Sequence, residues 1–555
     1  MASAGSTNGS SRRSYDAIVI GAGHSGLVAA FYLARAGWSV LMLDRRELVG
    51  GTCVTEEIFP GYRGSSVANA GHSLDPRIIN DMELERFGLR CTYPELGSLT
   101  MFADGRGLAP WRDREKRHAE IKKFARTERD VDGYYRVLDF FRRVARQMDI
   151  SFYDAPPSFA SVAARFQTPE DRRAFDQVMF APLADVLAQF LDSPELQAFF
   201  AGTAIATNLV GPYTPGSGYL LLQRPLWEES MRRVGTHEQN DLMMNNAAPL
   251  GGVGAITAAM ADSNRARGVE IRLGAEVARI LCRDGRAEGV ALADGTEFHA
   301  RTVLSNANPK FTLTRLLGPK DLGNEVYQRA EQIPMKGSSA KVHLALDGTP
   351  QFACATSSDE NELFLSTNFR VVPSLDTMQH AYNEARVGRW SRRPSMTGII
   401  DSARDPSMTP KGCHFVSLSV RGIPYYLADG TWDEQREEVG KAVVATLAEH
   451  IPNLSQILAG VHVYTPLDLE REFGLLEGNG AHGDIVPGQI FDSRPMPGCA
   501  DNRTPLAGLY LCGVGTWPGN YMSGITGYNA SQRMLADAHI RPEPDPMETS
   551  EGTIA

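Results

Sequence analysis

The stretch YDAIVIGAGHSGLVAAFYLARAGWSVLMLDRRELVGG, residues 15–51, decides the fold of this chain. Residues 16–20 predict a short buried strand, and residues 27–36 predict a helix with apolar side chains on more than one face. A second strand is predicted over residues 39–43 and runs directly into Asp44. Strand, glycine turn, helix, second strand and acid in this order are typical of a βαβ unit that binds a dinucleotide.

Three glycines form a G-x-G-x-x-G motif between the first strand and the helix. Gly21 lets the chain turn, Gly23 lets a pyrophosphate approach the backbone, and Gly26 lets helix and strand pack closely. The free N–H groups at the start of the helix attract phosphates. Asp44 can accept hydrogen bonds from ribose hydroxyls and would repel a 2′-phosphate. The unit therefore predicts FAD or NAD rather than NADP; a glycine-rich turn in an ordinary α/β protein is the alternative.

The residues that flank the motif extend the predicted phosphate site. Arg45 supplies a cation, and the pair Gly50-Gly51 again lets backbone approach a phosphate. His24 lies inside the glycine turn and is expected to pack near the pyrophosphate. The cofactor-binding residues predicted at this end of the chain are Gly21, Gly23, His24, Ser25, Gly26, Asp44, Arg45, Gly50, Gly51 and Thr52.

Composition limits the class of protein. The chain has 555 residues, which favours two or more modules, and its net charge of -10 argues against a nucleic-acid partner. Its 7 cysteines show no C-x-x-C spacing, so we expect no metal site, no redox dithiol and a reducing compartment. No apolar run has the length of a membrane span, and residues 1–13 lack the apolar core of a secretory signal. We expect a cytoplasmic protein, with organelle targeting as the alternative, that has a flexible leader over residues 1–13 and a disordered tail over residues 541–555.

Helical patterns dominate the region that follows the first unit. Residues 130–147 predict one helix, and residues 175–200 carry two strongly apolar helical runs. A buried helical cap is the favoured interpretation. The wall of a lipophilic tunnel, or a patch that contacts a membrane surface, is the alternative.

Two later regions predict further parts of a nucleotide-binding domain. Near residue 250 a glycine run precedes a helix over residues 255–267, and strands are predicted over residues 269–273, 277–282, 287–293, 297–300 and 302–306. No second complete G-x-G-x-x-G accompanies them, so a separate NAD domain is not expected. At the far end a strand over residues 506–511 runs through a glycine-rich loop into a helix over residues 525–539, with Ser523 as the predicted N-cap.

The region between them lacks nucleotide motifs. Residues 340–346 and 414–420 alternate with period two and predict strands, and residues 432–451 predict an amphipathic helix. Strands with helices suit a substrate-binding domain.

Several of these motifs together resemble one family. The sequence resembles the phytoene-desaturase superfamily of FAD-dependent oxidoreductases in DAIVIGAGHSGLVAA (16–30), VLSNANP (303–309), GLYLCGVGTWPG (508–519) and SGITGYNAS (523–531). Within it, the sequence resembles the pyridine-nucleotide-disulphide-oxidoreductase-domain-containing protein 2 branch in TPGSGYLLL (214–222), PKGCHFVSL (410–418) and LDLEREFGL (467–475). The resemblance implies FAD as the cofactor. It also places on the cofactor Val277 near the adenine, Asn306, and Gly513, Pro518, Gly524 and Ile525 near the isoalloxazine.

The resemblance implies an α/β fold in which a split Rossmann-like FAD-binding domain is interleaved with a substrate domain of mixed β-sheet plus helices. We assign residues 14–75, 245–310 and 500–540 to the FAD-binding domain, and residues 76–244 and 311–499 to the substrate domain and its helical cap.

One motif departs from the family pattern. Where the superfamily usually has THPGGG, this chain has TWPGNY over residues 516–521. Bulky side chains near the flavin would reshape the pocket, so a carotenoid substrate is not assumed. Trp517 and Tyr521 are predicted to stack on or flank the flavin, and His482 matches a histidine of the resembling branch and is the predicted acid–base residue. Arg494 binds an acidic substrate group or pairs with a carboxylate, and we favour the carboxylate.

The predicted function is an FAD-dependent dehydrogenase or desaturase that takes a hydride from a largely apolar small molecule onto flavin N5. The alternatives are a flavin amine oxidase, a redox-neutral flavin isomerase, and a non-catalytic FAD-stabilised interaction protein. The expected partner is a lipophilic small molecule and not a nucleic acid. Peripheral membrane contact and a homo-oligomer stay open at this point.

Overall fold

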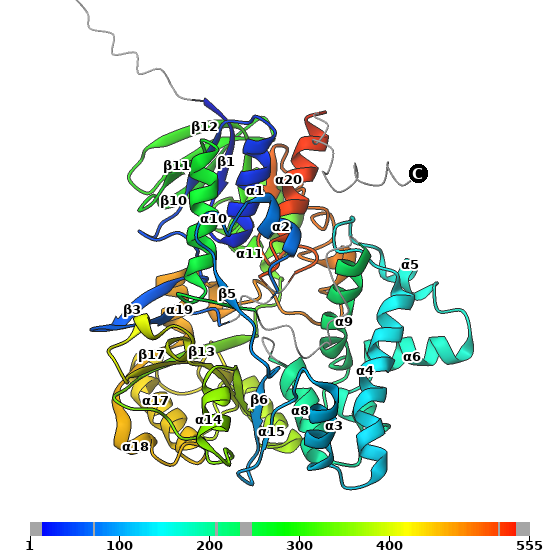
Figure 1. Ribbon diagram of the computed structural model, residues 1–555. Helices are drawn as coiled ribbons and strands as arrows, with labels where there is room; N and C mark the ends of the chain where they lie inside the picture. The colour runs from blue at the N-terminus through cyan, green and yellow to red at the C-terminus, as the bar shows by residue number, and fades with distance from the viewer. Residues whose placement is uncertain (1–13, 70–72, 206–208, 234–246, 520–521, 540–555) are drawn as a thin grey trace, which may run out of the picture.

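The computed structural model describes residues 14–69, 73–205, 209–233, 247–519 and 522–539. The predicted leader (1–13) and tail (541–555), and the predicted site residue Tyr521, lie outside the described residues. Within them the chain forms two seven-stranded sheets, one above the other in Figure 1, with a group of helices beside them. The predicted α/β class, with a Rossmann-like sheet and a second mixed sheet, is confirmed.

The first sheet, here called the cofactor sheet, collects strands from three distant parts of the chain. Its order is β10-β11-β12-β1-β2-β9, and β18 also pairs with β12. Strands β1, β2, β9, β12 and β18 are parallel, and β10 and β11 form an antiparallel meander that leads into β12. The strands are β1 (Ser14–Ile20), β2 (Val40–Leu43), β9 (Glu270–Arg272), β10 (Val277–Arg283), β11 (Arg286–Leu292), β12 (Glu297–Ser305) and β18 (Leu509–Leu511).

Strand β12 corrects one prediction. Two strands were expected over residues 297–300 and 302–306, and the structure has a single strand. Residues 297–299 pair with β11 and residues 303–305 pair with β18, while β1 runs along the other side from His299 to Ser305. The change of partner falls near the exposed Arg301, where the apolar pattern breaks but the hydrogen-bonded ladder with β1 continues.

The two ends of the described chain meet on one face of this sheet. Helix α1 (His24–Arg35) lies between α10 (Gly254–Ala266) and α20 (Ile525–Asp537), and Figure 1 shows α1 in blue beside α20 in red. Thr526 Oγ1 donates a hydrogen bond to Ser25 Oγ at 2.9 Å. A Cβ on Gly527 would lie 2.0 Å from the Ser25 carbonyl oxygen, so only glycine permits this approach. The predicted N-cap Ser523 is corrected to Gly524, whose φ is +78°, although the Ser523 hydroxyl does accept from the N–H of Ile525.

The second sheet, here called the substrate sheet, has two different faces. Its strands, in spatial order, are β17 (Leu458–Tyr464), β13 (Ser338–Leu346), β16 (His414–Ile423), β15 (Met396–Ile399), β14 (Phe369–Val371), β6 (Leu99–Met101) and β7 (Gly107–Leu108). Alternate residues such as Val342, Leu344 and Val416 form an apolar core with Val439 and Val443 of α17 (Trp432–Ala448). The side chains between them form the opposite, polar face, which is described below.

Within the described ranges, seven helices form a cap beside both sheets (Figure 1). They are α3 (Arg114–Lys122), α4 (Glu128–Met148), α5 (Phe159–Ala163), α6 (Pro169–Phe180), α7 (Leu183–Ala188), α8 (Pro194–Ala204) and α9 (Gly218–Arg233). The two apolar runs predicted over residues 175–200 therefore belong to three helices. Most of their apolar side chains are buried in one cluster, as the cap interpretation requires, while Phe159 and Phe180 stay 38% and 50% exposed. Among the helices that the structure describes, none is both long and apolar enough to cross a membrane.

The remaining elements connect these layers. The short ladders are β3 (Thr55–Phe59) with β4 (Tyr62–Ser65), and β5 (Cys91–Thr92) with β8 (Ala248–Pro249). The further helices are α2 (Pro76–Asp81), α11 (Pro309–Thr314), α12 (Pro319–Leu322), α13 (Asn324–Glu331), α14 (Ser358–Leu365), α15 (Leu375–Arg386), α16 (Asp401–Arg404), α18 (Leu454–Ile457) and α19 (Pro466–Phe473).

Candidate functional site

The first glycine turn leaves no room for side chains. Gly21 has a φ of +93°, and Gly23 is the N-cap of α1. A Cβ on Gly23 would lie 2.7 Å from Asn306 Nδ2, and a Cβ on Gly26 would lie 2.5 Å from the Gly21 carbonyl oxygen. Asn306, which follows β12, thus lies directly beneath the turn, and the free N–H groups of α1 form an anion-binding end beside it.

Asp44 lies next to this turn at the end of β2. It is 9% exposed, and its carboxylate accepts hydrogen bonds from the N–H groups of Ala22 at 2.7 Å and Arg46 at 2.9 Å. Burial raises the pKa of the Asp44 carboxyl, while these hydrogen bonds and the Arg46 charge oppose the rise. The Asp44 carbonyl also accepts from the N–H of Ala275, two residues before the predicted adenine neighbour Val277. The structure therefore brings Val277 and Asp44 to the same end of the sheet.

The Gly50-Gly51 loop lies against the first turn. Gly23 and Gly50 form a parallel bridge, and the N–H of Gly50 donates to the Ala22 carbonyl at 2.8 Å. Both Gly50 and Gly51 have positive φ values. The next residue, Thr52, accepts a hydrogen bond from the N–H of Ala68. The two glycine segments therefore lie side by side, and a phosphate contact by Gly50 and Gly51 stays a prediction.

The arginine next to these glycine segments is not the one that sequence order suggests. Arg45 Nη2 donates to the carbonyls of Glu470 and Arg471 at the end of α19, where helix carbonyls lack intrahelical partners. Arg46 instead reaches the loop, with Nη1 3.4 Å from the Gly51 carbonyl oxygen and Nη2 2.6 Å from Glu56 Oε1. A phosphate contact by Arg45 stays a prediction.

Two histidines lie at the junction of the N-terminal and C-terminal segments. His24 Nε2 is 3.1 Å from Ser25 Oγ, and burial lowers the pKa of His24 to about 4. His482 has a φ of +55° and a buried Nδ1 without a hydrogen-bond partner in the described structure. Burial, followed by the charges of Arg494 and His24, lowers the pKa of His482 to about 4. Both rings are therefore neutral at physiological pH, and His482 is a weak proton acceptor; its catalytic role stays a prediction.

The C-terminal glycine loop crosses the same site. A Cβ on Gly513 would lie 2.8 Å from the Asn306 carbonyl oxygen, so this loop passes directly over Asn306. Trp517 is 3% exposed, its indole N–H donates to the Asp154 carbonyl at 3.1 Å, and its ring lies 5.4 Å from that of Phe152. The Trp517 ring thus packs into the cap, and a contact with flavin stays a prediction. Pro518 follows it, and Gly524 and the fully buried Ile525 begin α20.

Arg494 differs from both sequence interpretations. Its guanidinium donates to the main-chain carbonyls of Ala481, Gly483, Asp484 and Val514 at 2.7–3.4 Å. Burial lowers the pKa of Arg494 to about 10. The side chain therefore holds the His482 loop to the C-terminal glycine loop, and the predicted pairing with a carboxylate is wrong for this conformation.

These groups fit a flavin dinucleotide. The glycine segments offer backbone N–H groups where side chains are excluded, which suits a pyrophosphate, and Asp44 offers carboxylate oxygens at the position of a ribose. The N-terminus of α20, at Gly524, faces the same region and carries a partial positive charge that favours an electron-rich ring. An adenine dinucleotide with a ring system at its far end therefore matches the chain's two ends.

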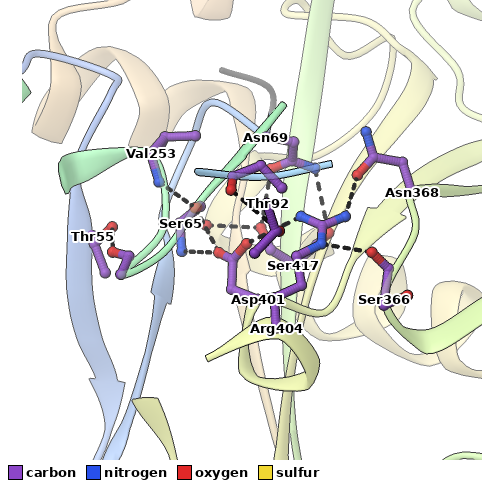
Figure 2. A network of polar contacts seen from close by, with 12 residues as sticks. Thr55, Ser65, Asn69, Thr92, Val253, Ser366, Asn368, Asp401, Arg404 and Ser417 are labelled. Carbon is purple, nitrogen blue, oxygen red and sulfur yellow. Dashed lines mark hydrogen bonds and ion pairs between the residues drawn. The ribbon is translucent and has the colours of Figure 1, made fainter. Parts of the chain in front are cut away.

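A buried polar network joins the substrate sheet to β4 and to the start of α10. Figure 2 shows Ser65, Asp401 and Ser417 at its centre. Ser65 donates to Asp401 Oδ2 from both its N–H and its hydroxyl, at 3.0 and 2.6 Å, and its carbonyl accepts from Ser417 Oγ at 2.8 Å. The N–H of Val253, at the start of α10, donates to Ser65 Oγ at 3.1 Å. Arg404 lies 4.0 Å from Asp401 and donates to the carbonyl of Ser366.

Lys341 extends this network toward the cofactor side. It is 1% exposed on β13, and its Nζ donates to Asn69 Oδ1, to Ser417 Oγ at 2.9 Å and to Ser419 Oγ at 3.3 Å. Asn69 follows Ala68, which is hydrogen-bonded to Thr52 beside the Gly50-Gly51 loop. Burial lowers the pKa of Lys341 to about 7, although the Asp401 charge opposes the change. A buried amine that titrates near neutral pH is a candidate acid–base group.

Replacing Asp401 with alanine should lower the free energy of unfolding of the holoprotein by about 1–3 kcal/mol, because Ser65 would lose two buried hydrogen bonds. Thermal unfolding of the variant checks this. Asp262→Ala, which removes one exposed ion pair with Arg265, is the control and should change stability by no more than about 0.5 kcal/mol. Equal midpoints for both variants would contradict a structural role for the network.

Sequence reasoning missed Lys341 because its signal was ambiguous. In the strand over residues 338–346, Lys341 and His343 alternate with apolar residues. That pattern predicts one polar face, which is usually the solvated face of a sheet. Here the polar face is covered by the cofactor domain, and only the tertiary structure shows that the lysine is buried.

The chain is similar to several known proteins in sequence and in fold. The family model described as flavin containing amine oxidoreductase matches residues 24–380. The rat (Rattus norvegicus) pyridine nucleotide-disulfide oxidoreductase domain-containing protein 2 is 33% identical, over 96% of this chain and 95% of that protein. A limonene dehydrogenase chain from Castellaniella defragrans is 26% identical, over 96% of each chain. The structure of putrescine oxidase bound to putrescine is similar in fold, with a TM-score of 0.61 at 17% identity over 95% of this chain and 100% of that one.

Proposed function

This chain belongs to the flavin-containing amine oxidoreductase family and is an FAD-dependent oxidoreductase, and from that premise we propose that it dehydrogenates a largely apolar small molecule. Its cofactor is FAD. The resemblance to the domain-containing protein 2 branch is confirmed by the rat relative. When bound, FAD accepts a hydride from a C–H bond while a proton leaves the neighbouring atom, so that the substrate loses two electrons and two protons.

The apolar cap supports the proposal that the substrate is largely apolar. The helices beside the cofactor sheet bury a large cluster of aromatic and aliphatic side chains, and Trp517 and Ile525 of the C-terminal segment belong to the same cluster. The apolar cap therefore continues up to the loop that lies over Asn306. A small cavity lined by Phe152, Tyr219 and Trp517 of this cluster lies beside that loop, and apolar walls of this kind hold apolar ligands and exclude water. The relative whose name includes limonene dehydrogenase supports dehydrogenation of an apolar molecule.

Lys341 is better suited than His24 or His482 to hold or accept a proton. A general base works best when its pKa lies near the working pH. The pKa of Lys341 is about 7, whereas those of His24 and His482 are about 4, so the two histidines are weaker bases. The Lys341 Nζ lies on the polar face between Asn69 and Ser417, where the substrate sheet meets the cofactor-binding loops.

Lys341→Met should slow substrate-driven flavin reduction about a hundredfold or more, because general-base catalysis of this kind is lost. In the unaltered protein the reduction rate should rise as pH increases through about 7, since the neutral amine is the form that accepts a proton. The variant should lose this rise and keep its FAD content. Stopped-flow reduction measured from pH 5.5 to 9 checks both features. Lys441→Met, which alters an exposed lysine on α17, is the control.

Anaerobic bleaching of the flavin by a panel of apolar hydrocarbons, alcohols, acids and amines tests the proposed function. We expect apolar non-amines to bleach the flavin, with one unsaturated product formed per flavin reduced. Bleaching by amines alone, with peroxide released in air, would favour an amine oxidase. Substrate rearrangement without net reduction would favour an isomerase, and no bleaching by any member of the panel would contradict the proposal.

A further inference from the structure

Two arginines project from the polar face of the substrate sheet. Arg370 on β14 lies directly opposite Thr397, which lies opposite Ser419, which lies opposite Lys341. Directly opposed residues on neighbouring strands project from the same face. Arg421 lies two residues beyond Ser419, and its Nη2 donates to Thr397 Oγ1 at 2.7 Å. The side chains of Arg370 and Arg421 therefore project from the same face of the substrate sheet as Lys341.

Few polar groups in the part of the chain that the structure describes contact Arg370 and Arg421. Each guanidinium carries five N–H donors. In the described residues, Arg370 donates only to Ser98 Oγ at 2.7 Å. Arg421 donates to Thr397 and, through Nη1, to the Ile205 carbonyl at 2.8 Å. Most of their donors are free for another acceptor.

No carboxylate of the described structure lies within 4.0 Å of either guanidinium, the limit for an ion pair. Other arginines of this region do have acidic partners: Arg404 has Asp401, and Arg436 has Asp468. Burial lowers the pKa of Arg370 to about 10, and burial together with the Arg370 charge lowers the pKa of Arg421 to about 9. Two neighbouring, half-buried cations that have no carboxylate partner among the described residues would be stabilised by an anion bound between them.

Apolar side chains of the helical cap lie next to Arg370 and Arg421. Ile205, whose carbonyl binds Arg421, directly follows α8 and belongs to the apolar cap cluster. Val372, two residues after Arg370, belongs to the same cluster, and a Cβ on Gly202 would lie 2.6 Å from its Cγ2. The arginines therefore lie where the apolar cap meets the polar face.

We propose that Arg370 and Arg421 bind a carboxylate of the substrate, so that the substrate is an apolar molecule with one acidic group. This proposal rests on the proposed function, because it identifies the chemical group at one end of the apolar substrate that the cap holds. Guanidinium groups match the planar geometry of a carboxylate and bind it with two parallel hydrogen bonds. An apolar body against the cap and an acid on the arginines would fix the substrate in one orientation.

The register also fixes which end of the substrate reacts. Arg370 lies three strands from Lys341, a separation of about 14 Å at the usual strand spacing. A carboxylate held by Arg370 is therefore remote from the proposed proton acceptor. The oxidised C–H bond lies in the apolar part of the substrate and not next to its acid.

Binding of matched ligands to the FAD-loaded protein tests the proposal. Dodecanoate, dodecanol and dodecyl phosphate are titrated in phosphate-free buffer and followed by isothermal calorimetry and by the flavin absorbance. We expect dodecanoate to bind about tenfold or more tightly than dodecanol, as charge-assisted hydrogen bonds provide. Arg370→Met and Arg421→Met should each abolish this preference while leaving dodecanol binding unchanged. Arg392→Met, which alters an exposed arginine paired with Glu438, should keep it.

The other possible results of this experiment each support or overturn the carboxylate site. FAD content and thermal midpoint show whether a variant is folded; if one is not, Arg370→Lys or Arg421→Lys replaces it and should retain only part of the preference. Equal binding of acid and alcohol, no binding of dodecanoate, or a preference that survives both methionine variants would overturn the proposal. Tighter binding of dodecyl phosphate than of dodecanoate would overturn it in favour of a phosphate site. If the preference for dodecanoate depends on the arginines but no acid reduces the flavin, the carboxylate site is supported and the proposed dehydrogenase activity is contradicted. If uncharged compounds reduce the flavin and no preference for the acid is found, the dehydrogenase activity is supported and the carboxylate site is contradicted.

Discussion

Gly26→Ala should weaken FAD binding about a hundredfold, a loss of about 2.8 kcal/mol. The added Cβ would lie 2.5 Å from the Gly21 carbonyl oxygen and 3.2 Å from Asn306 Cβ, so the glycine turn would have to move. Helix propensity alone predicts that Gly26→Ala stabilises the protein, because alanine stabilises a helix by about 1 kcal/mol relative to glycine. Fluorescence titration of the apoprotein with FAD measures the change.

Gly480 supplies the matched control for this substitution. It has ordinary backbone geometry, and a Cβ there would meet nothing within 4 Å. Gly480→Ala should therefore bind FAD as the unaltered protein does. Unchanged FAD affinity in Gly26→Ala would mean that the first turn does not hold the cofactor.

The second large effect is expected at the contact between the two ends of the chain. Gly527→Ala would put a Cβ 2.0 Å from the Ser25 carbonyl oxygen, and neither backbone can yield without separating α20 from α1. We expect lower thermal stability and, because Ser25 and Gly524 belong to the same site, an FAD affinity at least about tenfold weaker. Differential scanning fluorimetry and FAD titration measure the two effects separately.

Gly133→Ala distinguishes loss of the site from loss of stability. A Cβ on Gly133, in the cap helix α4, would lie 2.1 Å from the Phe190 carbonyl oxygen, a clash of similar severity far from the glycine turns. This variant should lose stability but keep its FAD affinity while folded. If both variants lost FAD affinity equally, the effect of Gly527→Ala would be one of general destabilisation.

The local parts of this fold could be predicted because their signals lie within short stretches. The βαβ unit and the second glycine loop each combine an apolar strand with glycines at positive φ, and Asp44 directly follows an apolar strand. Their boundaries shift by a few residues, as with α1, which begins at His24 and not at residue 27. The assignment of residues 500–540 to the FAD-binding domain came from the family resemblance rather than from spacing.

The partners of long polar side chains could not be predicted. Arg45 is adjacent in sequence to the phosphate loop, yet it contacts carbonyls of residues 470 and 471. Arg494 was expected to meet a carboxylate and instead binds main-chain carbonyls of two loops. Arg370, Arg421 and Lys341 share one face only because strands far apart in sequence pair in a particular register. Such contacts depend on tertiary structure, and a single sequence does not encode them in any local pattern.

We expect both ends of this chain to bind one molecule of FAD. Release of the flavin from the purified protein by heat, followed by chromatographic separation, measures its identity and amount against the protein concentration. We predict FAD, at one molecule per chain. A colourless protein that takes up no FAD, or one that releases FMN, would contradict this account.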